Sequence, residues 1–286
     1  MNPKVSIIIP VYNWSNYLWE AINSALNQTY KNIEILVIND GSNDNGATKQ
    51  IALSFDEKIK YYEKDNWWVA TALNLWIKKA TWEYISWLSH DDLYHINKIK
   101  EQIKLLNTLE KKENKIICTN FNIINEKNKI INKIKYKNKI NINFEIIKTT
   151  SFINWCTLII PKKVFNTIWY FDIKLKTTQD YNMWIRLIKW WYKFIHLNKT
   201  LVNYRIHNKQ DSINKKQIML KEVNILHKYI ITSFSKEEIK KISSLKINKY
   251  LIYLYIKHCY IKQKILFYIT IKLQKIWLYD FLKRNI

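Results

Sequence analysis

Short apolar runs alternate with amphipathic segments along the first 210 residues of the chain. Runs rich in Val, Ile and aromatic residues predict buried strands at 4–9, 33–38, 59–62 and 83–88. Apolar residues at helical spacing predict helices between them, at 15–27, 46–55 and 69–80. This alternation predicts an α/β fold with a Rossmann-like, mostly parallel sheet flanked by helices.

The pattern is less regular after the fourth predicted strand. Helices are expected at 97–110 and 178–191, and strands at 155–161 and 200–206. Residues 122–148 are rich in Asn, Lys and Ile without a clear period, which favours a loop. Ser15 stands where it could cap the first helix.

The character of the chain changes near residue 213. Residues 213–286 predict helices and carry 16 Lys and Arg against 4 Asp and Glu. We therefore predict an α/β domain at 1–212 and a basic helical appendage at 213–286. Residues 250–273 mix Ile, Tyr and Lys, which favours either a helix lying on an anionic membrane surface or packing against the first domain.

The chain shows no targeting signal that we can identify. It has no run of 18 uncharged apolar residues, and its start lacks the basic region and cleavage site of a signal peptide. Three cysteines are scattered without metal-ligand spacing. These features predict a reduced, cytoplasmic location, with peripheral contact at the inner face of the membrane as an alternative.

The formal net charge is +24. Lys, Asn and Ile have A/T-rich codons, so codon bias is one explanation, and attraction to phosphates is the other. A basic nucleic-acid-binding protein would explain the charge, but it would give two ordered acidic loops no purpose. We therefore predict no nucleic-acid partner.

The two acidic loops follow predicted strands. Residues 39–42 (NDGS) end the strand at 33–38, and residues 89–92 (SHDD) end the strand at 83–88. Ligands bind at the carboxyl ends of the strands in such sheets. The sequence therefore predicts a nucleotide site at this edge.

Six segments carry a family resemblance: VSIIIPVYN (5–13), NIEILVINDGS (32–42), WLSHDD (87–92), CTLIIPKKVF (156–165), TQDYNMWIRL (178–187) and YRIH (204–207). In order and spacing they resemble family 2 glycosyltransferases over about 210 of 286 residues. The resemblance implies a GT-A-type fold and an inverting transfer of sugar from a nucleotide-diphosphate donor. The implied acceptor is a saccharide or a lipid-linked sugar in surface polysaccharide or glycolipid synthesis.

By this resemblance, Asp91 and Asp92 lie at the family's acidic metal site. A divalent cation, Mg²⁺ or Mn²⁺, would stabilise the leaving diphosphate, and hard cations prefer carboxylate oxygens. Ser89 replaces the first Asp of the motif, so one ligand is lost or waters complete the shell. His207 is a further candidate for contact with metal or diphosphate, and the alternative is a structural role, which a lone His more often has. The alternative for the Asp pair is that it caps the next helix.

The resemblance also assigns a nucleotide pocket. Asp40 would accept a hydrogen bond from the nucleobase, or would form a turn before Gly41. Leu73 stands where many relatives carry an Arg that reaches the diphosphate, so that contact is absent. The remaining nucleotide-site candidates are Pro10, Val11, Tyr12, Asp65, Asn66 and, shared with the metal site, Asp91.

Asp180 aligns with the family's catalytic base. An inverting transfer needs one carboxylate to take the proton of the attacking hydroxyl. Gln179 replaces a common Glu, but the base position is kept. The alternative is an Asp that is favoured at a helix N-terminus by the macrodipole.

Tryptophan and glycine are present in unusual numbers. The chain has 13 Trp and 2 Gly, whereas average usage would give about 20 Gly. Against the family, Trp occupies expected glycine positions: 67, 68, 76, 82, 155 and 169, and plausibly 14, 19, 190 and 191. Some A/T-rich bacteria read UGA as glycine, and translation of UGA as Trp would produce this pattern. The alternative is a truly Trp-rich protein.

Two other functions remain open for the same motifs. A related enzyme that loads a polyprenyl phosphate would share the donor site and differ only in the acceptor. A non-catalytic nucleotide-sugar-binding protein would be consistent with Ser89 and with genuine Trp residues.

Overall fold

The computed structural model describes residues 2–66, 69–79, 83–137, 140–148, 152–208, 210 and 215–243. The chain divides into two compact units, Met1–Met219 and Leu220–Ile286, which are described separately. Three of the tryptophans at expected glycine positions lie outside the described residues: Trp67, Trp68 and Trp82.

A five-stranded sheet organises the first unit. Its order is β3 (Lys60–Glu63), β2 (Ile33–Asn39), β1 (Val5–Val11), β4 (Tyr84–Trp87) and β8 (Ile160–Pro161). The first four strands run parallel, and β8 pairs antiparallel with β4. Every residue of β1 is buried, because a parallel strand in the middle of a sheet is covered on both faces. The mostly parallel sheet is therefore confirmed.

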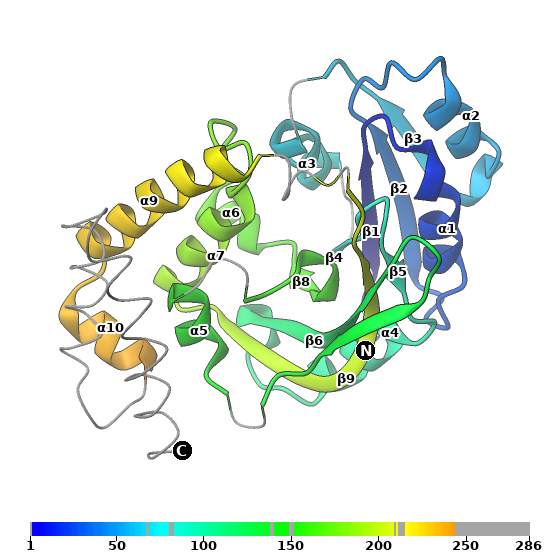
Figure 1. The fold of residues 1–286 in the computed structure, drawn as a ribbon. Helices are drawn as coiled ribbons and strands as arrows, with labels where there is room; N and C mark the ends of the chain where they lie inside the picture. The colour runs from blue at the N-terminus through cyan, green and yellow to red at the C-terminus, as the bar shows by residue number, and fades with distance from the viewer. Residues whose placement is uncertain are drawn as a thin grey trace. The chain divides into compact units, whose positions relative to one another are not determined.

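Helices cover both faces of the parallel strands. In Figure 1, α1 (Ser15–Leu26) and α2 (Ala47–Leu53) lie on one side and α3 (Val69–Lys79) lies on the other. The apolar face predicted for the first helix is the buried one: Leu18, Ala21, Ile22 and Ala25. Ser15 is not the cap of α1, because the N-cap is Trp14, which makes no side-chain capping bond.

A second sheet has the order β5 (Leu93–Tyr94), β9 (Lys193–Arg205), β6 (Lys115–Ile124) and β7 (Ile130–Ile134). β6 pairs parallel with β9 and antiparallel with β7. The interpretation of residues 122–148 as a loop is wrong, since they include the end of β6, all of β7 and α5 (Ile142–Lys148). Polar positions along this hairpin hid its strands, because β7 is largely exposed.

The remaining elements of the first unit are short, apart from two helices. They are η1 (Asp56–Lys58), α4 (Lys98–Asn107), η2 (Lys112–Asn114), η3 (Trp155–Thr157), α6 (Val164–Ile168) and α7 (Gln179–Lys189). The strand expected at 155–161 is wrong for its first half, which forms the single turn η3 before β8 begins. The helix expected at 178–191 is confirmed as α7.

The described part of the predicted appendage is helical. It consists of α9 (Lys216–Ser233) and α10 (Lys236–Ser243). Residues 244–286, which include the stretch with the interfacial pattern, lie outside the described residues. Among the helices that are described, none combines the length and apolar character needed to cross a membrane.

Candidate functional site

A cavity of about 760 Å³ lies where the strands of the five-stranded sheet end. Residues 10–14 at the end of β1, Asp40 after β2 and residues 89–91 after β4 form one part of its wall. The segment that ends β9 and continues beyond it forms another part, with Tyr204, His207 and Gln210. The carboxyl-end edge of the sheet is thus hollowed, as the strand–loop pattern predicts.

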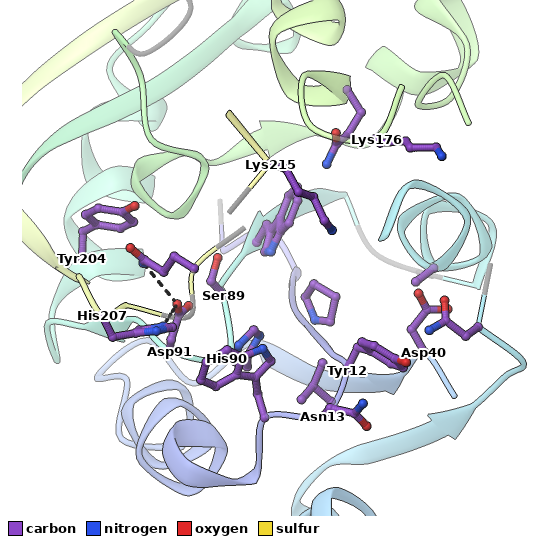
Figure 2. A pocket seen from close by; sticks show the side chains of 18 residues that line it. Tyr12, Asn13, Asp40, Ser89, His90, Asp91, Lys176, Tyr204, His207 and Lys215 are labelled. Carbon is purple, nitrogen blue, oxygen red and sulfur yellow. Dashed lines mark hydrogen bonds and ion pairs between the residues drawn. The ribbon is translucent and has the colours of Figure 1, made fainter. Parts of the chain in front are cut away.

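Seven of the ten sequence candidates line this cavity: Pro10, Val11, Tyr12, Asp40, Asn66, Asp91 and His207. Asp65, Asp92 and Asp180 are not among the lining residues. In Figure 2, Tyr12 and Asp40 lie toward one end of the cavity, and Asp91 and His207 lie toward the other. The fold therefore separates a candidate nucleotide end from a candidate metal end.

Lining residues that the sequence analysis missed include Trp14, Lys176, Gln179, Gln210 and Lys215. The two lysines come from loops before α7 and α9, where no pattern links them to the acidic loops. Gln179 could have been found, because it adjoins Asp180 in the recognised motif. Leu73, the residue in place of an Arg, is 2% exposed and belongs to the core.

Asp40 is held at the nucleotide end by neighbours in the same sheet. Its backbone N–H donates to the carbonyl of Val11 at 2.9 Å, and its carboxylate pairs with the ammonium of Lys64, just beyond β3. The side chain of Asn39, not that of Asp40, accepts from the backbone N–H of Ser42 at 2.8 Å. The turn-forming role therefore belongs at least in part to Asn39, and Asp40 presents a nearly buried carboxylate to the cavity wall.

Gly41 makes the close approach of two loops possible. It has φ +72°, and a Cβ at this position would lie 2.6 Å from the backbone nitrogen of Asn66. A side chain is therefore excluded by both conformation and space. Glycine at 41 places Asn66 on the cavity wall beside Asp40.

Asp91 and His207 form a pair at the other end. Nε2 of His207 lies 3.0 Å from Oδ2 of Asp91. The indole of Trp14 stacks on His90 with ring centroids 5.4 Å apart and lies 4.6 Å from the ring of His207. Burial opposes ionisation of Asp91, but the charge of His90 and the hydrogen bond with His207 outweigh it and lower the pKa of the carboxyl. Asp91 is therefore a carboxylate at neutral pH.

Asp92 has a different environment. It is 1% exposed, and its Oδ1 accepts from the backbone N–H of Arg205 at 2.9 Å. Burial, reinforced by the negative charge of Asp91, raises the pKa of Asp92 well above its usual range. The Asp pair caps no helix, because the N-cap of α4 is Asn97. The structure places Asp92 under the loop, away from the cavity wall where the sequence suggested a metal ligand.

Asp180 lies in the first turn of α7, next to the cavity-lining Gln179. Its Oδ1 accepts from the backbone N–H of Tyr181 at 2.6 Å. The side chain is half-buried. This position suits a carboxylate at a helix N-terminus, and it also suits a proton acceptor at the cavity edge.

The cavity fits a divalent cation in one limited way. Among the residues that the structure describes, no three His, Cys, Asp or Glu side chains gather as a metal cluster. Asp91 and His207 offer one oxygen and one nitrogen side by side. Mg²⁺ commonly binds through one or two carboxylates together with substrate phosphates, so this pair fits an ion that the donor itself helps to hold.

A carboxyl-end cavity with acidic loops on both sides of β1 is typical of nucleotide-binding α/β proteins. The family model of glycosyl transferase family 2 matches residues 6–169, which is more than half of the chain. The chain therefore belongs to glycosyl transferase family 2, and the resemblance of its motifs is confirmed.

Relatives with assigned names agree with this placement. An uncharacterized glycosyltransferase of Rickettsia felis is 43% identical over 245 residues, which is 84% of this chain and 40% of the relative. The Escherichia coli protein WfgD, named UDP-Glc:alpha-D-GlcNAc-diphosphoundecaprenol beta-1,3-glucosyltransferase, is 32% identical over 189 residues, covering 65% of this chain and 70% of WfgD. The chain thus spans less than half the length of its Rickettsia felis relative.

Solved structures share the fold. S. aureus TarS 1-349 in complex with UDP-GlcNAc superposes with a TM-score of 0.63 at 19% identity, over 86% of this chain and 72% of TarS. The mannosyltransferase PcManGT from Pyrobaculum calidifontis, in complex with GDP-Man and Mn²⁺, gives 0.62 at 13% identity, over 89% and 72%. At these identities the similarity shows the fold alone, and it confirms the predicted GT-A-type architecture.

Proposed function

We propose that the chain transfers a sugar from a nucleoside-diphosphate donor to a saccharide or lipid-linked acceptor in surface polysaccharide or glycolipid synthesis of the cell envelope. The observation that carries the proposal is the single cavity wall shared by Asp40, Asp91 and His207 in a chain of this family. UDP-GlcNAc in the complex with TarS and the UDP-Glc in the name of WfgD support a nucleotide-sugar donor.

The metal end would hold Mg²⁺ or Mn²⁺ through Asp91 and His207. A cation there would act as a Lewis acid that stabilises the negative charge of the leaving diphosphate. The lowered pKa of Asp91 supports this role, because a ligand must be deprotonated to bind the ion. Mn²⁺ in the complex of PcManGT supports the choice of ion.

The nucleotide end would bind the base and ribose. Asp40 would accept from a base N–H in a pocket formed with Pro10, Val11 and Tyr12, and Asn66 would complete its rim. Asp65 would contribute to this loop through its backbone, since its carbonyl accepts from Lys64.

Asp180 would be the catalytic base of an inverting displacement. The acceptor oxygen attacks the anomeric carbon, its proton moves to the carboxylate, and the bond to the diphosphate oxygen breaks. The half-buried position at the start of α7, beside Gln179 on the cavity wall, supports this assignment.

The base assignment is tested with Asp180→Asn. The variant should lower kcat by roughly 10²- to 10⁴-fold, the usual contribution of a general base, while UDP affinity measured by calorimetry stays unchanged. Asp172→Asn is the matched control, since its carboxylate accepts from the backbone N–H of Lys174 outside the cavity wall. Turnover that survives Asp180→Asn would remove Asp180 from the mechanism. Absence of turnover with every donor, while UDP still binds, would favour a non-catalytic nucleotide-sugar-binding protein.

The acceptor and location are part of the same proposal. Residues 1–212 would carry the catalytic site, and the basic residues 213–286 would bring the protein to the inner face of the membrane. Full-length protein should co-sediment with vesicles that contain anionic lipid, but not with neutral vesicles, and added salt should release it. Polyprenyl phosphate as the preferred acceptor in a turnover assay would select the alternative reaction.

We also propose that glycine stands at several of the tryptophan positions in the cell's protein. Trp169 has φ +67° and ψ 175°, a combination that is essentially restricted to glycine, and Trp191 has φ +63°. Both are exposed, at 77% and 42%. The ring centroids of Trp155 and Trp184 are 4.0 Å apart, which is closer than aromatic pairs prefer. The buried indole N–H of Trp155 has no hydrogen-bond partner among the described residues.

Peptide mass spectrometry of the protein from its native organism tests this proposal. Glycine at 155, 169 and 191 is expected, with UGA at those codons of the gene. Tryptophan in these peptides, or UGG at these codons, would overturn it.

A further inference from the structure

Arg205 is a completely buried cation at the end of β9. It does not line the cavity, and it stands two residues before the candidate ligand His207. A guanidinium stays charged at all physiological pH values, so its burial is unfavourable unless its donors are satisfied. The hydrogen-bond partners of Arg205 therefore show what this buried charge stabilises.

The inner side of Arg205 is bonded to the acidic loop. Its Nε donates to the backbone carbonyl of Asp91 at 2.7 Å, and its backbone N–H donates to Oδ1 of Asp92 at 2.9 Å. Its own carbonyl accepts from Nε2 of Gln210 at 2.5 Å. The loop after β4 and the segment after β9 are thus joined through one residue.

The outer side of Arg205 is bonded to two other elements. Nη2 pairs with Glu20 of α1 at 3.0 Å, and Nη1 donates to Oδ1 of Asn128 in the β6–β7 turn at 2.6 Å. Nδ2 of Asn128 donates to the same Glu20 carboxylate at 3.0 Å. The guanidinium also lies 4.2 Å from the ring centre of Tyr17. The guanidinium is therefore held in one orientation by the side chains of Glu20, Asn128 and Tyr17.

We propose that Arg205 is a positioning residue that holds the Asp91 carboxylate against the His207 imidazole. The two side chains are then already oriented when a divalent cation binds. The inference rests on the proposed function of that pair. Asp91 is held through its own carbonyl and through Asp92, while His207 lies two residues further along the chain. Partners that orient metal ligands from outside the coordination shell commonly change metal affinity 10- to 100-fold when they are removed.

Arg205→Lys tests the proposal, because lysine keeps the charge but cannot make the forked contacts. Mn²⁺ affinity in the presence of UDP, measured by calorimetry, should fall about 10- to 100-fold. The loss in kcat/KM should be recovered at high Mn²⁺ concentration, which a purely structural defect would not allow. Arg186→Lys is the matched control, since this arginine donates to the carbonyls of Ile168 and Tyr170 away from the cavity wall.

Two milder variants test the outer contacts of Arg205 without touching the acidic loop. Glu20→Gln and Asn128→Ala should each weaken Mn²⁺ binding several-fold, and Glu20→Gln should add little to Arg205→Lys, because both act through one contact. If all these variants lower only the melting temperature, as is expected of Arg186→Lys, the proposal is overturned. Wild-type protein without Mn²⁺ affinity would overturn it too. A fall in Mn²⁺ affinity in a protein that transfers no sugar would keep the positioning role and remove the proposed function.

Discussion

The two acidic loops follow β2 and β4, the strands on either side of β1 in the sheet, yet they are held in different ways. After β2, the carboxylate of Asp40 pairs with Lys64, which follows the adjacent strand of the same sheet. After β4, Asp91 contacts His207, which follows β9 of the other sheet and lies 116 residues further along the chain. The contact of the Asp40 loop lies within the parallel sheet. The contact of the Asp91 loop joins the parallel sheet to the second sheet.

This difference leads us to expect different functional roles for the two loops. The Asp40 loop needs only contacts within the parallel sheet and the glycine at 41. The Asp91 loop depends on a buried arginine and on long-range pairing of β6 with β9. We expect changes at the second loop to alter chemistry, and changes at the first to alter affinity for the donor.

Among variants of the two acidic loops, the largest effect is expected for Asp91→Asn. Removal of the carboxylate charge should reduce kcat/KM by at least about 100-fold, corresponding to ~2.7 kcal/mol, because the leaving diphosphate loses its ion. Mn²⁺ affinity measured by calorimetry should fall in parallel. An Asp91→Asn protein that keeps both values would remove the distinction between the two loops.

A smaller effect is expected for Asp40→Asn. The amide keeps the shape but loses the charge-assisted contacts, so UDP affinity should fall roughly 10-fold, or ~1.4 kcal/mol. The value of kcat should change little, because the contact between Asp40 and the nucleobase is equally strong in the bound donor and in the transition state. Asp56→Asn, an exposed position in η1, serves as the control. A loss confined to kcat would contradict the separation of nucleotide and metal ends.

The smallest effect on activity is expected for Asp92→Asn. The amide oxygen can still accept from the backbone N–H of Arg205, so Mn²⁺ affinity should stay within about 3-fold of wild type. A loss as large as that of Asp91→Asn would restore Asp92 to the metal site, where the sequence analysis placed it.

The same variant should change the pH dependence of stability. The pKa of Asp92 is raised in the folded protein, so its protonated form contributes stability that is present below the unfolded-state pKa and is lost as the pH rises through the folded-state pKa. Asparagine does not ionise, so the variant should gain relative to wild type as the pH is raised. Thermal unfolding at pH 5, 7 and 9 should show a relative gain of roughly 2–4 °C at the alkaline end. A difference that is constant with pH would show that Asp92 does not titrate as proposed.

Much of the first sheet was predictable because its signals are local. β1, β2 and β4 are short, continuous apolar runs, and their covering helices have a clear periodicity. β7 was missed because its residues are largely exposed and give no buried face, and β6 was missed although it is mostly buried, because its partner β9 is remote. α5 was missed because it lies in the same stretch without a clear period. The residues 155–157 were assigned to a strand on their apolar composition, which a buried turn shares.

The candidate site also has features that the sequence predicts and features that it does not. Asp40 and Asp91 could be found from the sequence, because acidic residues after buried strands fall at the ligand edge of a parallel sheet. The different environments of Asp91 and Asp92 could not, since they are neighbours in one motif. Burial and the charge of Asp91 raise the pKa of Asp92, whereas His90 and His207 lower that of Asp91.

By itself, the sequence determined the parallel α/β order, the two acidic loops at strand ends and the membership of the family, because these depend on patterns within short segments. Only the tertiary structure decided which carboxylate faces the cavity, that Asn66 approaches Gly41, and that one buried arginine joins α1, the hairpin turn and the acidic loop. These features arise from contacts between residues as many as 185 positions apart, where packing and desolvation, which no local pattern encodes, determine the environment of each group.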